Sequence, residues 1–297
     1  MAQGTHSFSP LDFLQLVAVP LIWGVNNVLA MVAIAELPPL IVAGLRFTLV
    51  LGALFWMLGA PPAGRRALFF TMLAVVGPLH MGVQYVGLGM ARDLAPMVVA
   101  MQLWAPASVV FAAMLLGERV GALRGFGVAL AFIGAAGMNF EPAVLAQWPA
   151  LALVALASML YGLGTVLVRR LGGGLDPWAM QAWVALACAP SLLLASAAFE
   201  RGQVAAMASA SWLAWACIVF GALVSSILAN AFMFRLLQRY EVSRTTPYML
   251  LTPVVSFSLA SLVLGDTITP QILVGAGLAM AGVALVALAE QRGRLRA

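Results

Sequence analysis

The sequence contains few charged residues and no lysine. Only 8% of its 297 residues are charged, its fifteen basic residues are all arginine, and 64% of its residues are hydrophobic. Average soluble domains carry about 25% charged residues, so this composition excludes a soluble fold. The mean hydropathy of +1.05 predicts a membrane protein with little chain left for a soluble domain.

Cysteines and enzyme motifs are also scarce. The two cysteines, Cys188 and Cys217, lie in separate apolar segments, and we interpret them as packed small side chains, not as a disulfide or a metal site. The chain lacks the GxxxxGK(S/T) loop of ATP-driven proteins and the HExxH motif of zinc proteases. We therefore expect no cofactor, no metal, no nucleic-acid partner and no enzymatic activity.

Ten apolar segments are long enough to cross a bilayer, which requires about 20 mostly apolar residues each. They predict an all-α polytopic membrane fold. The expected helices cover residues 11–34, 38–58, 67–90, 95–116, 122–140, 149–168, 177–198, 212–234, 244–264 and 270–289.

The placement of arginine predicts the orientation of the chain. With ten spans and a cytoplasmic N-terminus, twelve arginines fall on the cytoplasmic side, and only Arg92 and Arg201 fall on the other side. Positive residues accumulate in cytoplasmic loops, so we expect both termini in the cytoplasm. This unequal distribution of arginines is obtained only with an even number of spans, and it therefore also favours ten spans.

Internal matches indicate a duplicated chain. IWGVNNVL (22–29) aligns with LYGLGTVL (160–167), LLGERVGALRGFGVALAFIG (115–134) aligns with VLGDTITPQILVGAGLAMAG (263–282), and Pro106 aligns with Pro253 between them. Each half, residues 11–140 and 149–289, holds five spans. Because five is odd, the second half enters the membrane from the opposite side. Two inverted five-helix repeats are typical of transporters with alternating access to a midplane site.

Several of these segments resemble a known family. PLIWGVNNVLA, LPPLIVAGLRF, LLGERV, RYEVSRTTPYMLLTPVVSFSLASLVLGDTIT and the glycine-rich last helix are similar to the EamA family of the drug/metabolite transporter superfamily, over nearly the whole chain. The similarity is greatest to its amino-acid and metabolite exporters, such as those of aromatic amino acids, cysteine and O-acetylserine. It implies a bacterial inner-membrane location, a central cavity lined by helices 1–4 and 6–9, and helices 5 and 10 at the periphery.

No carboxylate lies near the middle of a predicted span. The first helix reads WGVNN, without the acid that small multidrug exporters of the same superfamily use for proton exchange, which disfavours a cation antiporter. Arg46, in contrast, lies about 12 Å below the start of its helix, too deep to reach the surface. Three roles remain open: a clamp on helix-end carbonyls or on Asn26 and Asn27, a partner for a substrate carboxylate, or exposure to water.

Helical spacing places further polar and aromatic residues toward the interior. Trp23, Asn26 and Asn27 share one face of the first helix, where amides either bind an amino-acid zwitterion or join helices. His80 could bind substrate, carry a proton or bond a neighbour as a neutral ring. Met and aromatic side chains form either an apolar cavity wall or ordinary packing. The remaining candidates are Gln84, Met101, Trp104, Tyr161, Gln181, Trp183, Asn230 and Tyr248.

These observations predict an exporter of neutral, aromatic or sulfur-containing amino acids and related metabolites. We expect alternating access, facilitated diffusion or exchange without ATP, a small-molecule substrate, a surrounding lipid bilayer, and a monomer or homodimer. A drug or toxic-cation exporter of the same superfamily is the alternative. An intramembrane hydrolase would need a nucleophile–base pair, which the single in-span histidine does not supply.

Overall fold

The described part of the first half of the chain consists mainly of helices. The computed structural model describes residues 9–117, 121–137, 146–172, 176–239, 248, 249 and 251–294, and no strand occurs among them. The helices of the first half are α1 (Pro10–Glu36), α2 (Pro39–Leu54), the single 3-10 turn η1 (Phe55–Met57), α3 (Arg66–Ala74), the π-helical segment η2 (Val75–Leu79), α4 (His80–Met90), α5 (Leu94–Met101), α6 (Trp104–Leu116) and α7 (Ala122–Gly137).

The second half has a similar composition of elements. Its helices are α9 (Trp148–Leu171), α10 (Pro177–Phe199), the short α11 (Gln203–Ser209), α12 (Trp212–Val219), the π-helical segment η4 (Phe220–Ala229), α13 (Asn230–Arg239), α15 (Leu251–Leu259), the π-helical segment η5 (Ala260–Leu264) and α16 (Pro270–Arg294).

Seven helical stretches within the described residues are long and apolar enough to cross a membrane. They confirm the prediction of an all-α polytopic membrane protein. Three shorter apolar helices, Ala122–Ala135, Leu251–Leu264 and Pro270–Val286, correspond to the other three predicted spans. The start of the predicted 244–264 span lies outside the described residues. The seven are Pro10–Glu36, Pro39–Met57, Arg66–Met90, Leu94–Leu116, Trp148–Leu171, Pro177–Phe199 and Trp212–Met233.

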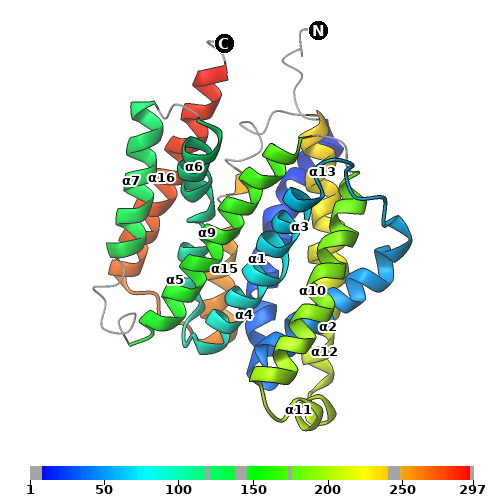
Figure 1. The fold of residues 1–297 in the computed structure, drawn as a ribbon. Helices are drawn as coiled ribbons and strands as arrows, with labels where there is room; N and C mark the ends of the chain where they lie inside the picture. Colours follow the sequence, from blue (N-terminus) through cyan, green and yellow to red (C-terminus); the bar gives the residue numbers. More distant parts are fainter. Residues whose placement is uncertain are drawn as a thin grey trace.

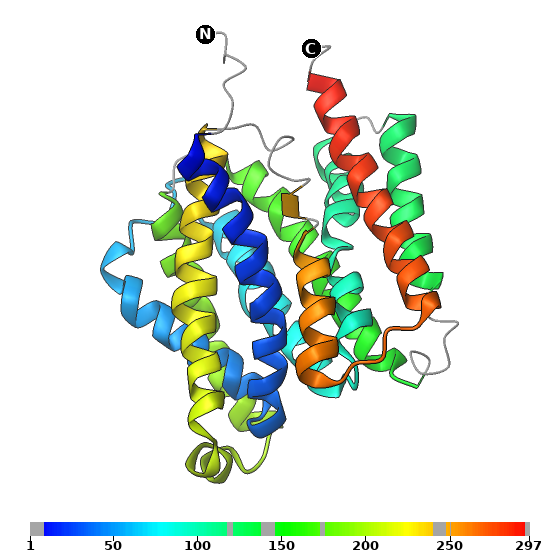
Figure 2. The same ribbon diagram turned by 180° about the vertical axis from the view of Figure 1, so that it is seen from behind.

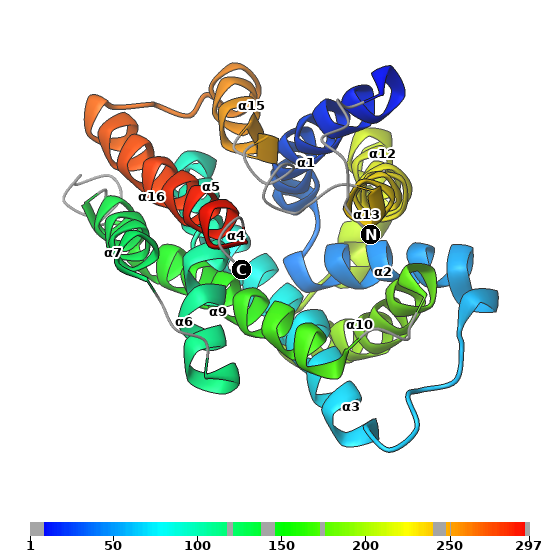
Figure 3. The same cartoon turned by 90° about the horizontal axis from the view of Figure 1, so that it is seen from above.

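The helices pack into a bundle in which α7 and α16 lie side by side at one edge, while α2, α10 and α12 form the other (Figures 1 and 3). One apolar core joins α1, α2, α10 and α12, and a second joins α1 to α4, α5, α9, α15 and α16. The helix α1 begins, and α16 ends, at the same end of the bundle (Figure 2).

Glycines allow α7 and α16 to approach closely. A Cβ atom at Gly134 would lie 2.7 Å from the carbonyl oxygen of Gly275, and one at Gly282 would lie 2.6 Å from that of Gly127. Both distances are below van der Waals contact, so only glycine fits at these crossings. Small residues that bring backbones together are a common basis of helix association in membranes.

Prolines and π-helical segments interrupt several spans. Pro106 follows the break between α5 and α6, because its ring is incompatible with an α-helical carbonyl at Gln102. Pro78 lies inside η2, next to Gly77, whose φ of −90° and ψ of −105° are not helical. Pro253 lies inside α15.

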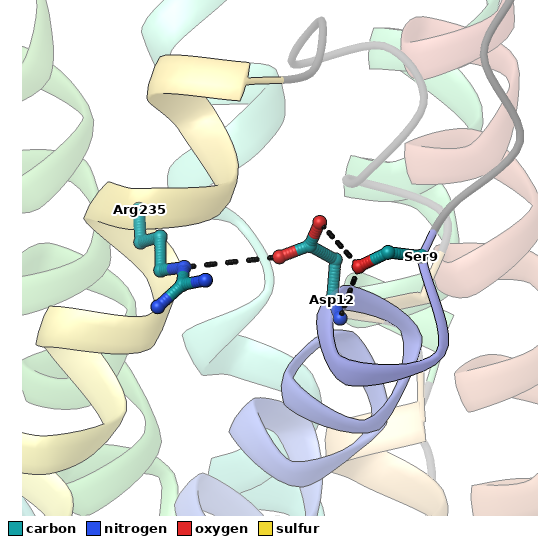
Figure 4. Close-up of polar contacts among 3 residues, drawn as sticks. All are labelled: Ser9, Asp12 and Arg235. Atoms are coloured by element: carbon teal, nitrogen blue, oxygen red, sulfur yellow. Dashed lines mark hydrogen bonds and ion pairs between the residues drawn. The ribbon is translucent and has the colours of Figure 1, made fainter.

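An ion pair links α1 to α13 at the end of the bundle where α1 begins. The Asp12 carboxylate accepts a hydrogen bond from the Ser9 hydroxyl at 2.7 Å, and the Ser9 hydroxyl oxygen in turn accepts from the Asp12 backbone N–H at 3.1 Å (Figure 4). On its other side, Asp12 lies 3.8 Å from Arg235 Nε. Asp12 is buried, so its charge depends on these partners.

At the opposite end of the bundle, carboxylates cap helices that are distant in the sequence. Glu36, Glu200 and Asp266 accept hydrogen bonds from the first backbone N–H groups of α12, α2 and α5. Those N–H groups have no partner within their own helix, and the helix dipole favours a negative charge there. The bonds come from Ser211 N at 2.6 Å, Leu40 N at 2.7 Å, Ile41 N at 3.1 Å, Leu94 N at 2.6 Å and Ala95 N at 3.0 Å.

Asp266 is the most buried of these three carboxylates. Burial raises the pKa of its carboxyl group above the ordinary value, the backbone N–H groups of Ala95 and Leu94 act in the opposite direction, and the nearby Asp93 adds to the rise. The net direction is upward, so the ionised form is less favourable here than in water.

Candidate functional site

Arg46 lies at the centre of a buried polar cluster between α2, α4 and η4. It is 9% exposed, and all its partners are hydroxyl groups. Its Nε and Nη2 donate to Ser226 Oγ at 3.0 and 2.8 Å, Nη2 also donates to Ser225 Oγ at 3.4 Å, and Nη1 donates to the Tyr85 hydroxyl at 3.0 Å. No carboxylate of the described residues pairs with it. The cluster therefore holds an uncompensated positive charge.

The amides of Gln181 and Asn230 extend this cluster. Both side chains donate to the carbonyl oxygen of Ser226, Asn230 at 2.9 Å, and Asn230 Nδ2 also donates to the side-chain amide oxygen Oε1 of Gln181 at 3.1 Å. The Ser226 backbone carbonyl is accessible to these side chains because η4 has π-helical bonding. Such segments are frequent at functional sites. This connects α10 with the same turn of η4 that contacts Arg46.

Asn26 and Asn27 point to different parts of the molecule, because adjacent residues on a helix project about 100° apart. Asn27 donates to Ser256 Oγ at 3.1 Å, and Ser256 donates to the carbonyl of Gly24 at 3.2 Å, which joins α1 to α15. Asn26 instead lies beside Gly221 of η4: a Cβ atom at Gly221 would be 3.2 Å from Asn26 Oδ1 and 3.5 Å from Arg46 Nε. Asn26 thus neighbours Arg46, whereas Asn27 joins helices.

A second, aromatic cluster lies on the other side of α4. His80 Nδ1 is 2.8 Å from the carbonyl oxygen of Ala157, which can only accept, so Nδ1 carries a proton and donates it to this hydrogen bond. The His80 ring lies 5.0 Å from that of Tyr161, and Trp104 meets Tyr161 edge-on at 5.6 Å. Helix α4 connects the two clusters, because His80 and Tyr85 both belong to it.

Gln84 and Met101 lie together between α4 and α5, with Gln84 Nε2 3.9 Å from the Met101 sulfur. Three other candidates lie elsewhere. Trp23 and Tyr248 pack with Leu16, Val19, Leu236 and Met249 in a small apolar cluster near the start of α1. Trp183 donates to the carbonyl of Gly59 at 3.0 Å and packs on Phe69, next to a loop.

Sequence reasoning missed Tyr85, Ser225 and Gly221. Helical spacing pointed to Gln84, next to Tyr85, and to Asn230, one turn beyond Ser226, but two adjacent serines both reach Arg46. The π-helical bonding of η4 alters the spacing that an α-helix would give, and this change has no signal in the sequence. No group of three metal-ligating side chains occurs among the residues that the structure describes.

An all-helical chain with apolar helices of spanning length and polar side chains buried between them defines a multi-pass membrane protein. Residues 148–288 match the family model described as "EamA-like transporter family". This part of the chain is therefore similar to the EamA-like transporters, and the family resemblance predicted from the sequence is confirmed. The comparisons point to a transporter and not to an enzyme.

Relatives extend the similarity to almost the whole chain. A "Probable amino-acid metabolite efflux pump" of Salmonella typhimurium is 29% identical over 280 residues, which cover 91% of this chain and 92% of the relative. A protein of the same description from Escherichia coli is 26% identical, covering 89% and 91% of the two chains. An "Uncharacterized transporter" of Bacillus subtilis, YvbV, is 28% identical and covers 92% and 90%.

A solved crystal structure supports the fold. It matches with a TM-score of 0.65 at 19% identity, and covers 96% of this chain and 99% of its own. At this identity the match concerns the fold alone.

Proposed function

We propose that this protein exports amino acids and related metabolites across a bacterial inner membrane by alternating access. Facilitated diffusion or exchange would drive it without ATP. The observation that carries the proposal is the end-to-end similarity to two relatives named as probable amino-acid metabolite efflux pumps. Arg46 lies buried on one side of α4 and the aromatic cluster lies on the other. Arg46 fits the carboxylate of a substrate, and the aromatic cluster fits a bulky neutral side chain.

The proposed mechanism uses two inverted repeats, residues 11–140 and 149–289, with five spans each. The α7–α16 contact supports this, because Gly127 meets Gly282 and Gly134 meets Gly275, whereas the sequence aligns Gly127 with Gly275 and Gly134 with Gly282. Such crossed pairing is what a two-fold axis between the repeats produces. The π-helical segments η2 and η4 also lie in the third helix of each half.

The cavity residues that we propose are those that gather around α4. Arg46, Asn26, Gln181 and Asn230 form the polar side, while His80, Gln84, Met101, Trp104 and Tyr161 form the aromatic side. Asn27, Trp23, Tyr248 and Trp183 have structural partners, and we assign them to supporting roles. Both termini are proposed to face the cytoplasm, in a monomer or homodimer.

Uptake of labelled amino acids into proteoliposomes tests the proposal. A panel of neutral, aromatic and sulfur-containing amino acids is compared with and without a pH gradient, alongside a cationic drug panel. Saturable uptake of at least one amino acid without a gradient is the expected result. Absence of amino-acid uptake with saturable drug uptake would replace this proposal by a drug exporter, and uptake only with a gradient would overturn the facilitative mechanism. Gly277→Ala serves as a control for reconstitution: nothing lies within 4 Å of a Cβ atom there, so this variant should transport like the wild-type protein.

A further inference from the structure

We propose that Arg46 and Asn26 bind the two charged ends of an amino-acid zwitterion, the carboxylate on Arg46 and the ammonium group on Asn26 Oδ1. This assignment rests on the proposed function and specifies which chemical feature of the substrate the site selects. It comes from three observations: Arg46 has no counter-ion among the described residues, Asn26 has no hydrogen-bond partner among them, and both side chains meet at Gly221.

The first observation concerns charge. Arg46 is nine-tenths buried in a membrane-spanning bundle, and neutral hydroxyls of Tyr85, Ser225 and Ser226 are its only partners among the described residues. A buried cation is unfavourable unless an anion compensates it. The guanidinium group presents a planar fork that matches a carboxylate. The hydroxyl groups can rotate and donate to the same carboxylate when it arrives.

The second observation concerns Asn26. Its side-chain amide makes no hydrogen bond with any residue in the described part of the chain, whereas Asn27, Gln181 and Asn230 are all bonded. A polar group inside a membrane requires a partner, which is protein, water or ligand. The amide oxygen accepts hydrogen bonds, and an ammonium group offers three donors.

The third observation is distance. The ideal Cβ position of Gly221 lies 3.2 Å from Asn26 Oδ1 and 3.5 Å from Arg46 Nε, so the two polar atoms are less than 7 Å apart. In an amino acid the ammonium nitrogen and the carboxylate carbon are about 2.5 Å apart, and each charge-assisted hydrogen bond adds about 2.8 Å. This upper limit lies within the reach of a zwitterion in a bent arrangement.

Selectivity among analogues tests this assignment. The best substrate of the amino-acid panel is compared with its primary amide, which lacks the carboxylate, and with its deaminated acid, which lacks the ammonium group. We expect the wild-type protein to transport the amino acid at least about tenfold faster than either analogue, because sites built for a polar group discriminate strongly against its loss. Arg46→Gln should abolish discrimination against the amide, and Asn26→Leu should abolish discrimination against the deaminated acid.

Controls separate the possible outcomes. Thr48→Val, on the same helix as Arg46 but on its exposed face, should keep both ratios. If Arg46→Gln does not fold, Arg46→Lys should keep the preference for acids at reduced strength, and thermal stabilisation of the wild-type protein by the amino acid but not by its amide gives an independent reading. Variants that transport with wild-type ratios, or equal stabilisation by both compounds, would overturn the assignment. Failure of the wild-type protein to transport any amino acid would instead overturn the proposed function.

Discussion

The contact between α7 and α16 leads to a prediction whose size follows from the structure. A methyl group at Gly134 would lie 2.7 Å from the carbonyl oxygen of Gly275, and one at Gly282 would lie 2.6 Å from that of Gly127. Carbon and oxygen atoms need about 3.3 Å. Because the obstructing atoms are backbone, Gly134→Ala or Gly282→Ala must separate the helices by at least about half an ångström.

The expected loss is about 2 kcal/mol for each substitution. Overpacking typically costs 1–3 kcal/mol, and a gap of 0.5–1 Å already removes about a quarter to a half of the attraction between facing atoms. The two effects should not add, because helices separated by the first methyl group accommodate the second. The double variant should therefore lose about as much as either single variant.

Equilibrium unfolding in mixed detergent micelles measures these differences. Gly277→Ala lies on α16 without any atom within 4 Å of its new Cβ, and it should cost nothing or gain up to about 1 kcal/mol from helix propensity. If the alanine variants at positions 134 and 282 are as stable as Gly277→Ala, or if the double variant loses the full sum, the packing argument is refuted.

Two further predictions concern Asp266 and His80. Asp266→Ala should cost about 2 kcal/mol, because the first N–H groups of α5 lose their acceptor. Since the folded pKa of Asp266 is raised, its stabilising contribution is full below its unfolded pKa of about 4 and falls as the pH rises through the folded value. Asp266→Asn keeps an acceptor and should flatten this acidic part of the pH–stability curve; an unchanged curve would contradict the reasoning. His80→Asn places an amide donor near the position of Nδ1 and should preserve the pH profile of transport, whereas His80→Phe should lose about 0.5–1.5 kcal/mol because it removes the hydrogen bond that joins α4 to the Ala157 carbonyl of α9. If transport by the wild-type protein depends on pH and transport by His80→Asn does not, His80 is a proton carrier and this prediction is wrong.

The membrane class and the family were predictable from the sequence. Apolar length is a property of a continuous segment, and the seven spanning helices of the described chain match predicted segments within a few residues. Caps and prolines lie within a few residues of the helix ends they define, as Ser9 does for α1 and Asp176 for α10. Such signals act locally, so the one-dimensional pattern contains them.

The composition of the candidate site was only partly predictable. The burial of Arg46 followed from its depth in an apolar helix, but its partners Tyr85, Ser225 and Ser226 lie 39, 179 and 180 residues away in the sequence. Helical spacing placed Asn26 and Asn27 on one face, yet the packing of α15 and η4 against α1 gives them different neighbours.

The sequence by itself therefore determined that this chain is a membrane protein, which of its segments are long and apolar enough to cross a bilayer, and that a cation lies among them. These conclusions depend on hydrophobicity and helix rise, which each segment carries independently of the others. Only the tertiary structure decided that neutral hydroxyls surround Arg46 and that Asn26 joins it at Gly221. The reason is that such contacts arise where separate helices meet, and the π-helical bonding of η4 shifts its side chains away from the positions that a regular α-helix would predict.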